Sequence, residues 1–305
     1  MNKHTLRIII TDSGLGGLSV AAKIERELRK LRMGSDIELI FFNALADSNS
    51  GYNRMNNEED KINTFNSALN GMVSRFDPQL IVIACNTLSV IYPKTKFAQK
   101  CKIPVLEIIK AGVEIIYKNL KSDERSAAVI LGTETTVNSR VHQTELSSRG
   151  IPKSRIINLP CKYLESEIQK DPNSHEVRNL IAEYITQSLE KIETTAEKII
   201  FTLCCTHYSF SKSIFEKEIK KRIRTKFEII NLNEELISES LLQIKKFLKA
   251  NSGMGIIKTK TISRFKMPRA ELQIISGLLE KDSPSFAAAL LNYEQDKLLF
   301  NFPAC

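Results

Sequence analysis

Short apolar runs rich in Val, Ile and Leu alternate along the chain with longer segments in which apolar residues recur at helical spacing. Apolar runs of this kind, bounded by polar residues or Gly, are typical of parallel strands that are buried on both faces. The predicted strands are Leu6–Thr11, Ile37–Phe42, Leu80–Ala84, Val105–Ile109, Ala127–Leu131, Arg155–Asn158, Ile199–Leu203 and Phe227–Asn231. The predicted helices occupy residues 17–32, 56–76, 88–100, 110–120, 134–148, 175–195, 210–223 and 233–249. This alternation predicts an α/β fold in which crossover helices cover parallel sheets.

The pattern also repeats within the chain. The strand that begins at Arg7 and the strand that begins at Ala127 are 120 residues apart, and so are Cys85 and Cys205. Each of these two cysteines follows an apolar run, and each is followed by a helix and a further apolar strand. The repeat therefore predicts two pseudo-symmetric, doubly wound parallel-sheet halves.

Small polar residues stand where four of the predicted strands end. They are Asp12 with Ser13, Cys85 with Asn86 and Thr87, Gly132 with Thr133, and Cys205 with Thr206 and His207. Ligands of open α/β sheets bind beyond the carboxyl ends of the strands. If the halves face one another, Cys85 and Cys205 approach one ligand from opposite sides. This geometry suits a reaction that removes a proton from one face of a carbon and returns a proton to the other face.

A thiol is a reasonable base for such a reaction, because a helix N-terminus or a neighbouring histidine lowers its pKa. Neutral hydrogen-bond donors to hold the substrate carboxylates are available at Asn86, Thr87, Thr133, Thr136 and Thr206. The chemistry requires no organic cofactor.

Other interpretations of these motifs are weaker. "CCTH" at residues 204–207 lacks the usual spacing of zinc ligands, so no metal is expected. The "DSGLGG" turn has Ser19 where a dinucleotide fingerprint needs its third glycine. Cys204 and Cys205 are neighbours on a strand, so their side chains point to opposite sides and only one can face the cleft. The remaining cysteines are expected to pack as small apolar residues: Cys101, Cys161 and Cys305.

The 305 residues are enough for about two domains, and 42% of them are apolar. The net charge is +9, but no basic motif is interleaved with aromatic residues, so a solvated basic face is favoured over nucleic-acid binding. The sequence shows neither a signal-peptide core nor a membrane span, and the six cysteines are therefore interpreted as thiols of a cytoplasmic protein.

Four segments, in this order and spacing, resemble the signature segments of the cofactor-independent glutamate racemases, within the wider aspartate/glutamate racemase superfamily. They are "TDSGLGGLSV", "IACNTLS", "GTETTVNS" and "LCCTHYSF", and the likeness extends from about residue 5 to about residue 280. The resemblance implies two α/β domains with the active site between them, the C-terminal part of the chain returning to the first domain. On this sequence, residues 1–108 with 228–305 would form one domain and residues 109–227 the other.

The resemblance also implies roles for single residues. Cys85 and Cys205 match the two bases, and Asp12 and His207 match the polar partners that assist them. The positions that match substrate-holding residues are Ser13, Tyr52, Asn86, Thr87, Thr133, Thr136 and Thr206.

The chain departs from the family pattern in several places. Gly51-Tyr52-Asn53 stands where a Pro-Tyr-Gly turn is typical, and Lys162 and Gln169 replace a proline and a common carboxylate. Cys204 stands where a glycine is more usual. The segment after about residue 283 extends past the family pattern, and its apolar spacing predicts a helix docked either on this chain or on the second subunit of a homodimer.

The leading hypothesis is racemisation of L- and D-glutamate, which in the family supplies D-glutamate for peptidoglycan synthesis. The departures at Gly51-Tyr52-Asn53 and Gln169 leave open a racemase of aspartate or another small amino acid. A third hypothesis is a racemase-like binding protein with vestigial turnover, although both cysteines are intact.

Overall fold

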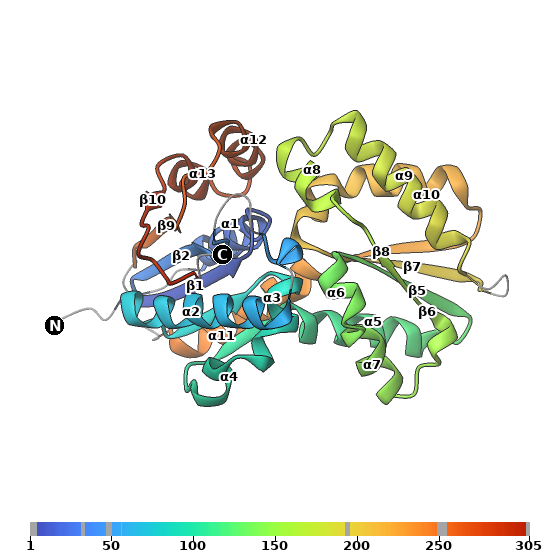
Figure 1. Cartoon of the computed structure of the whole chain (residues 1–305), viewed down its shortest axis with the longest axis horizontal. Helices are drawn as coiled ribbons and strands as arrows, with labels where there is room; N and C mark the ends of the chain where they lie inside the picture. The colour runs from blue at the N-terminus through green and yellow to red at the C-terminus, as the bar shows by residue number, and fades with distance from the viewer. Residues whose placement is uncertain are drawn as a thin grey trace.

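The computed structural model describes residues 5–31, 34–46, 51–55, 57–192, 196–248 and 255–302, and it contains two separate parallel sheets (Figure 1). The first sheet has the strand order β10-β9-β2-β1-β3-β4 and the second has the order β6-β5-β7-β8. The strands of the first sheet are β1 (Leu6–Asp12), β2 (Ile37–Asn43), β3 (Leu80–Ile83), β4 (Val105–Glu107), β9 (Ile257–Ser263) and β10 (Glu294–Gln295). Those of the second are β5 (Ser126–Gly132), β6 (Ile156–Pro160), β7 (Lys198–Cys204) and β8 (Lys226–Asn231).

The strand orders confirm two doubly wound α/β halves with related topology. The order β2-β1-β3-β4 in the first sheet corresponds to β6-β5-β7-β8 in the second, and all strand pairs among the described residues are parallel. Cys85 follows β3 closely, and Cys205 follows β7 directly. The two cysteines therefore occupy equivalent places at the carboxyl ends of equivalent strands.

Helices lie on both faces of each sheet (Figure 1). In the first part of the chain they are α1 (Leu18–Lys30), α2 (Glu58–Phe76), α3 (Asn86–Ile91), α4 (Lys96–Lys100) and α5 (Ile108–Ser122). The second sheet carries α6 (Glu134–Asn138), α7 (Val141–Ser148), α8 (Leu164–Lys170), α9 (His175–Leu189) and α10 (Lys212–Arg222). The chain then adds α11 (Leu232–Phe247), α12 (Arg269–Leu279) and α13 (Pro284–Leu291).

One hydrophobic core runs from the first sheet to the second through side chains of α1, α5 and α11. It includes Ile8 and Ile10 of β1 together with Ala128 and Ile130 of β5. Helices α5 and α11 approach closely at Gly112, where an added Cβ would lie 2.6 Å from a Cδ of Leu232. Because the two halves share this packed interior, the residues beneath the cleft between them are held in place.

Local chemistry divides two of the predicted helices. The predicted helix 88–100 becomes α3, a short 3-10 turn and α4, because Pro93 ends the first helix and the Thr95 side chain caps the second. The predicted helix 134–148 breaks into α6 and α7 at Arg140, which has a left-handed φ of 53°. The predicted strand 105–109 is shorter, since residues from Ile108 onward belong to α5.

The C-terminal segment contains β9, α12 and β10, which the sequence pattern did not predict, and α13, which it did. Helix α13 docks on its own chain, where Ser283 caps its first turn. The buried Glu25 carboxylate of α1 accepts hydrogen bonds from the hydroxyls of Ser283 and Ser285, and it pairs with Arg29. A homodimer stays a prediction.

The predicted boundary between residues 227 and 228 falls inside β8, whose whole length pairs with β7 of the second sheet. The chain returns to the first sheet only at β9. Cys305 and the outer ends of several predicted helices, at residues 32, 56, 193–195 and 249, lie outside the described residues. Within the described ranges, none of the helices combines the length and the apolar character that crossing a membrane requires.

Candidate active site

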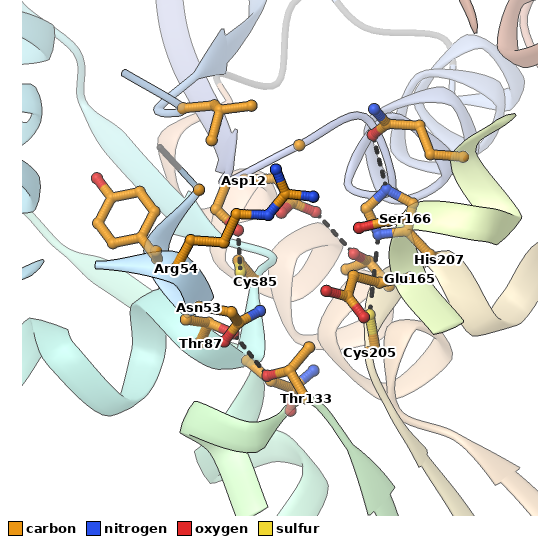
Figure 2. Close-up of a pocket in the computed structure, with 18 of the residues that line it drawn as sticks. Asp12, Asn53, Arg54, Cys85, Thr87, Thr133, Glu165, Ser166, Cys205 and His207 are labelled. Carbon is orange, nitrogen blue, oxygen red and sulfur yellow. Dashed lines mark hydrogen bonds between the residues drawn. The ribbon is translucent and has the colours of Figure 1, made fainter. Parts of the chain in front are cut away.

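A cavity of about 220 Å³ opens between the carboxyl ends of the two sheets (Figure 2). Residues that follow β1, β3, β5 and β7 line it, as the predicted convergence of strand ends requires. Both candidate bases and both of their predicted partners line this one cavity: Cys85, Cys205, Asp12 and His207. The two thiols come from different halves of the molecule and face the same space (Figure 2).

The Cys85 thiol lies at the N-terminus of α3, with Sγ 3.1 Å from the Ser13 hydroxyl. Only 6% of the residue is exposed. Burial raises the pKa of Cys85 to about 12, and the Asp12 carboxylate adds to this, whereas hydrogen bonds from Ser13 and from the backbone near Leu88 act in the opposite direction. Without a ligand this thiol therefore keeps its proton at neutral pH.

The Cys205 thiol faces His207, with 3.8 Å between Sγ and Nδ1. Burial raises the pKa of Cys205 well above its usual range, and the neighbouring Glu165 carboxylate raises it further. Burial also lowers the pKa of His207, although Asp12 opposes this effect. The pair is therefore a neutral thiol beside a neutral imidazole. Cys204 is also among the residues around the cavity, but its side chain packs in the core shared by the two halves, where its thiol contacts Thr202.

Asp12 joins the two halves at the cavity. Its Oδ2 accepts a hydrogen bond of 2.7 Å from the Thr206 hydroxyl, and the carboxylate is almost wholly buried. Thr206 begins the 3-10 segment Thr206–Ser211, which also carries His207. Thr206 thus holds in place a carboxylate that raises the pKa of both thiols.

The predicted neutral donors divide into cavity-lining residues and a supporting residue. The Thr87 and Thr133 hydroxyls lie 2.9 Å apart and both residues line the cavity. Thr136 does not line it; its hydroxyl lies 3.1 Å from that of Thr133, which it supports from behind. Asn86 lines the cavity, and neither its amide oxygen nor its amide nitrogen has a hydrogen-bond partner in the described structure, although the residue is buried. Such a side chain is suited to bind a polar ligand.

Tyr52 also lines the cavity, but its hydroxyl is already used. It donates to the Ala44 carbonyl at 3.1 Å, and the ring packs edge-on against Phe65. Its contribution to a ligand site is therefore the face of its ring and the position of the loop that it anchors.

Sequence reasoning did not place several other residues in the site: Asn53, Arg54, Glu165, Ser166 and Glu271 line the cavity too. Glu165 is largely buried beside Cys205; burial raises the pKa of its carboxyl group, while Asn53 and Arg54 favour the ionised form. Arg54 is exposed at the mouth of the cavity. The signals that could have found the first four are the two segments that depart from the family pattern: Gly51-Tyr52-Asn53, which Arg54 follows, and "LPCKYLESEIQ". Glu271 lies outside both segments.

Gln169, which stands where the family pattern commonly has a carboxylate, contacts His207 directly. Its Oε1 lies 3.0 Å from Nε2 of His207. Within the described residues, no three His, Cys, Asp or Glu side chains stand in an arrangement that could hold a metal ion.

Comparison with known proteins agrees with this geometry. The sequence pattern of the Asp/Glu/hydantoin racemase family matches residues 9–234, which contain both cysteines and every predicted site residue. The chain belongs to this family. Among racemases of the family, glutamate racemase from Staphylococcus epidermidis is 30% identical over 215 residues, covering 68% of this chain and 70% of that protein.

Glutamate racemase from Aquifex pyrophilus is 27% identical over 257 residues, covering 82% of this chain and 87% of its own. In three dimensions, the crystal structure of a glutamate racemase isoform from Bacillus anthracis has the same fold, with a TM-score of 0.68, 22% identity and 97% of each chain covered. The racemase fold thus extends over almost the whole chain, the C-terminal segment included.

Proposed function

We propose that this protein interconverts L- and D-glutamate by a two-base reaction that needs no cofactor. The observation that carries the proposal is the single cavity lined by Cys85 and Cys205 from opposite halves of the molecule. One thiolate removes the proton from Cα, and the thiol on the other face delivers a proton to the carbanion. One S–H bond forms as the other breaks, so the configuration inverts while the total number of protons on the two sulfurs stays the same.

The cavity also provides for the charges of an amino-acid substrate. Asp12 supplies a buried carboxylate near the position that an ammonium group would take, and Asn86, Thr87 and Thr133 offer neutral groups for a carboxylate. Arg54 adds a positive charge at the mouth, which favours a substrate with a second carboxylate. Preorganised donors of this kind stabilise the charge that develops on the carboxylate as Cα loses its proton.

Glutamate is the leading candidate substrate because the relatives that this chain resembles are glutamate racemases. By the same likeness, we assign the reaction to the cytoplasmic supply of D-glutamate for peptidoglycan synthesis. The specific observation that favours aspartate as a second candidate is the buried Glu165 carboxylate, which occupies part of the cavity and would disfavour a long acidic side chain.

The deciding experiment measures exchange of the α-proton of glutamate in deuterated water. The purified protein is used without added cofactor, and proton NMR monitors the loss of the α-proton signal. Aspartate and several neutral amino acids form the comparison panel. If the α-proton of glutamate exchanges fastest, the proposal is supported. If that of aspartate exchanges fastest, the second candidate is supported. If glutamate binds in calorimetry but no amino acid exchanges, the protein is a binding protein and the proposed reaction is wrong.

Single replacements test the two-base step. Cys85→Ser and Cys205→Ser should each lower racemisation by about 100-fold or more, because a hydroxyl is a far weaker acid than a thiol. Cys204→Ser is the matched control, since that thiol is adjacent in sequence but points into the core. Equal losses in all three variants would show that the losses arise from disturbed packing and not from proton transfer.

A further inference from the structure

A chain of hydrogen bonds leads away from the histidine of the site. His207 Nε2 lies 3.0 Å from Oε1 of Gln169, and Nε2 of Gln169 donates to the Glu271 carboxylate at 2.5 Å. The same Oε1 of Gln169 accepts a hydrogen bond of 3.0 Å from the backbone N–H of Leu15. Gln169 belongs to α8 and Glu271 to α12, which lie side by side where the two halves meet (Figure 1).

These contacts leave one orientation for the Gln169 amide. The Leu15 N–H can only donate, so the atom that faces it must be the amide oxygen. The Glu271 carboxylate can only accept when ionised, so the atom that faces it must be the amide nitrogen. Exchanging the two amide atoms would place donor against donor at Leu15 and would leave the Glu271 carboxylate without its donor.

The orientation of the amide decides the tautomer of the histidine. An amide oxygen at 3.0 Å requires a donor, so Nε2 of His207 carries the proton. In the neutral ring the other nitrogen, Nδ1, then has a free lone pair. Nδ1 is the atom that faces the Cys205 sulfur, at 3.8 Å.

We infer that Gln169, held by Glu271, is a positioning residue that fixes His207 in the Nε2–H tautomer and so turns Nδ1 into the acceptor of the Cys205 proton. The inference rests on the proposed function for its catalytic meaning. The S–H bond of Cys205 breaks as an N–H bond forms at Nδ1, which leaves a thiolate beside an imidazolium. That thiolate takes the Cα proton, and Cys85 gives its own proton to the opposite face. The thiols and the imidazole together hold the same number of protons before and after inversion.

The arrangement assigns a task to the C-terminal segment. Glu271 comes from α12, which follows β9 of the first sheet, whereas Gln169 and His207 come from the second half. The neutral amide of Gln169 accepts the hydrogen bond from Nε2 without adding a charge beside the ring. The negative charge of Glu271 lies one side chain further away. The imidazolium is therefore less strongly stabilised than it would be beside a carboxylate, and it returns its proton more readily.

The test is nitrogen NMR of the full chain with ¹⁵N-labelled histidine at pH 7.5, where His207→Gln identifies the His207 signals. We expect a protonated Nε2 and an unprotonated Nδ1 in the protein without ligand. Glu271→Leu removes the contact that holds the Gln169 amide nitrogen and leaves the amide only the Leu15 N–H, so the side chain can turn away from the ring and His207 should become a mixture of tautomers. Glu271→Gln keeps an acceptor for the amide nitrogen and should keep the tautomer. Gln273→Leu, on the exposed side of the same helix, is the matched control and should change nothing.

Kinetics supply a second readout. Glu271→Leu should lower kcat by about tenfold with a smaller change in KM, and Glu271→Gln should restore most of the loss. A proton on Nδ1 in the unaltered protein, or the same tautomer in Glu271→Leu, overturns the inference. The NMR experiment needs no turnover, so the positioning role and the proposed function can fail separately. If the Nε2–H tautomer depends on Glu271 but the protein exchanges no amino acid, the positioning role is supported and the proposed function is overturned.

Discussion

Gly16 is the position at which the loop after β1 touches the His207 segment most closely. A Cβ added there would lie 2.4 Å from the Thr206 hydroxyl oxygen, 2.6 Å from Nδ1 of His207 and 2.8 Å from its backbone nitrogen. Ordinary contacts of this kind are 3.4–4 Å, so the neighbours must move by about 1 Å. Thr206 is hydrogen-bonded to Asp12, and His207 is hydrogen-bonded to Gln169, so neither side chain is free to move away.

Gly16→Ala should therefore lower both stability and turnover. Forcing a methyl group into a packed contact costs about 1–3 kcal/mol. A shift of about 1 Å in a catalytic group lowers the rate by about 100-fold. The measurements are the free energy of unfolding in urea and the initial rate of glutamate racemisation, both on purified protein.

Gly277→Ala is the matched control. Gly277 lies on the exposed face of α12, and a Cβ added there would meet nothing within 4 Å. Alanine is the better helix former, so this variant should be more stable by about 0.5–1 kcal/mol and should keep full activity. If Gly16→Ala had the stability and activity of the unaltered protein, the close contact between the β1 loop and the His207 segment would be refuted.

Three further predictions follow from buried groups. The alkylation rate of Cys85 by iodoacetamide, read by peptide mass mapping, should rise about tenfold per pH unit from pH 7 to beyond 10, because burial raises the thiol pKa to about 12; a plateau near pH 9 would contradict this. Thr206→Val removes the donor to the buried Asp12 carboxylate and should lower the free energy of unfolding by about 1.5–3 kcal/mol in urea titrations; an unchanged midpoint would argue against the bond. Burial lowers the pKa of His142 to about 4, so the unfolded chain binds the proton first and stability falls as the pH drops from about 6.5 towards 4. His142→Leu should abolish this part of the fall, about 2 kcal/mol between pH 7.5 and pH 5, and parallel curves for the two proteins would show that His142 is not buried as a neutral group.

Strand positions were predictable because parallel strands buried on both faces appear in the sequence as continuous apolar runs. All eight of the predicted strands are present within about two residues at each end. Strand β9 was missed because "IKTKTIS" alternates lysine and threonine and looks like part of a basic surface segment. Its pairing with β2 depends on the return of the chain to the first sheet, and no local pattern encodes that return.

The candidate site was predictable as far as it consists of strand ends. Asp12 ends one strand, and Cys85, Thr133 and Cys205 follow three others, and all four residues line the cavity at which these strand ends converge. Glu165 and Gln169 reach the cavity from α8, a helix of seven residues with little apolar periodicity. The position of α8 is decided by its packing against α9 and α12, and the contact with α12 joins segments about a hundred residues apart.

The high pKa values of the two thiols, taken with the charges around them, tie their ionisation to substrate binding. In the unliganded cavity, burial opposes a thiolate at both Cys85 and Cys205, and the fixed charge of Asp12 opposes it at both as well. In the proposed reaction, an amino-acid substrate brings an ammonium group, which offsets the charge of Asp12 and stabilises a nearby thiolate. Asp12 cannot turn away from that ammonium, because Thr206 holds its carboxylate from the opposite half. Asp12 thus adds to the effect of burial, which keeps both thiols protonated in the unliganded cavity, and in the proposed reaction it attracts the group that allows one of them to ionise.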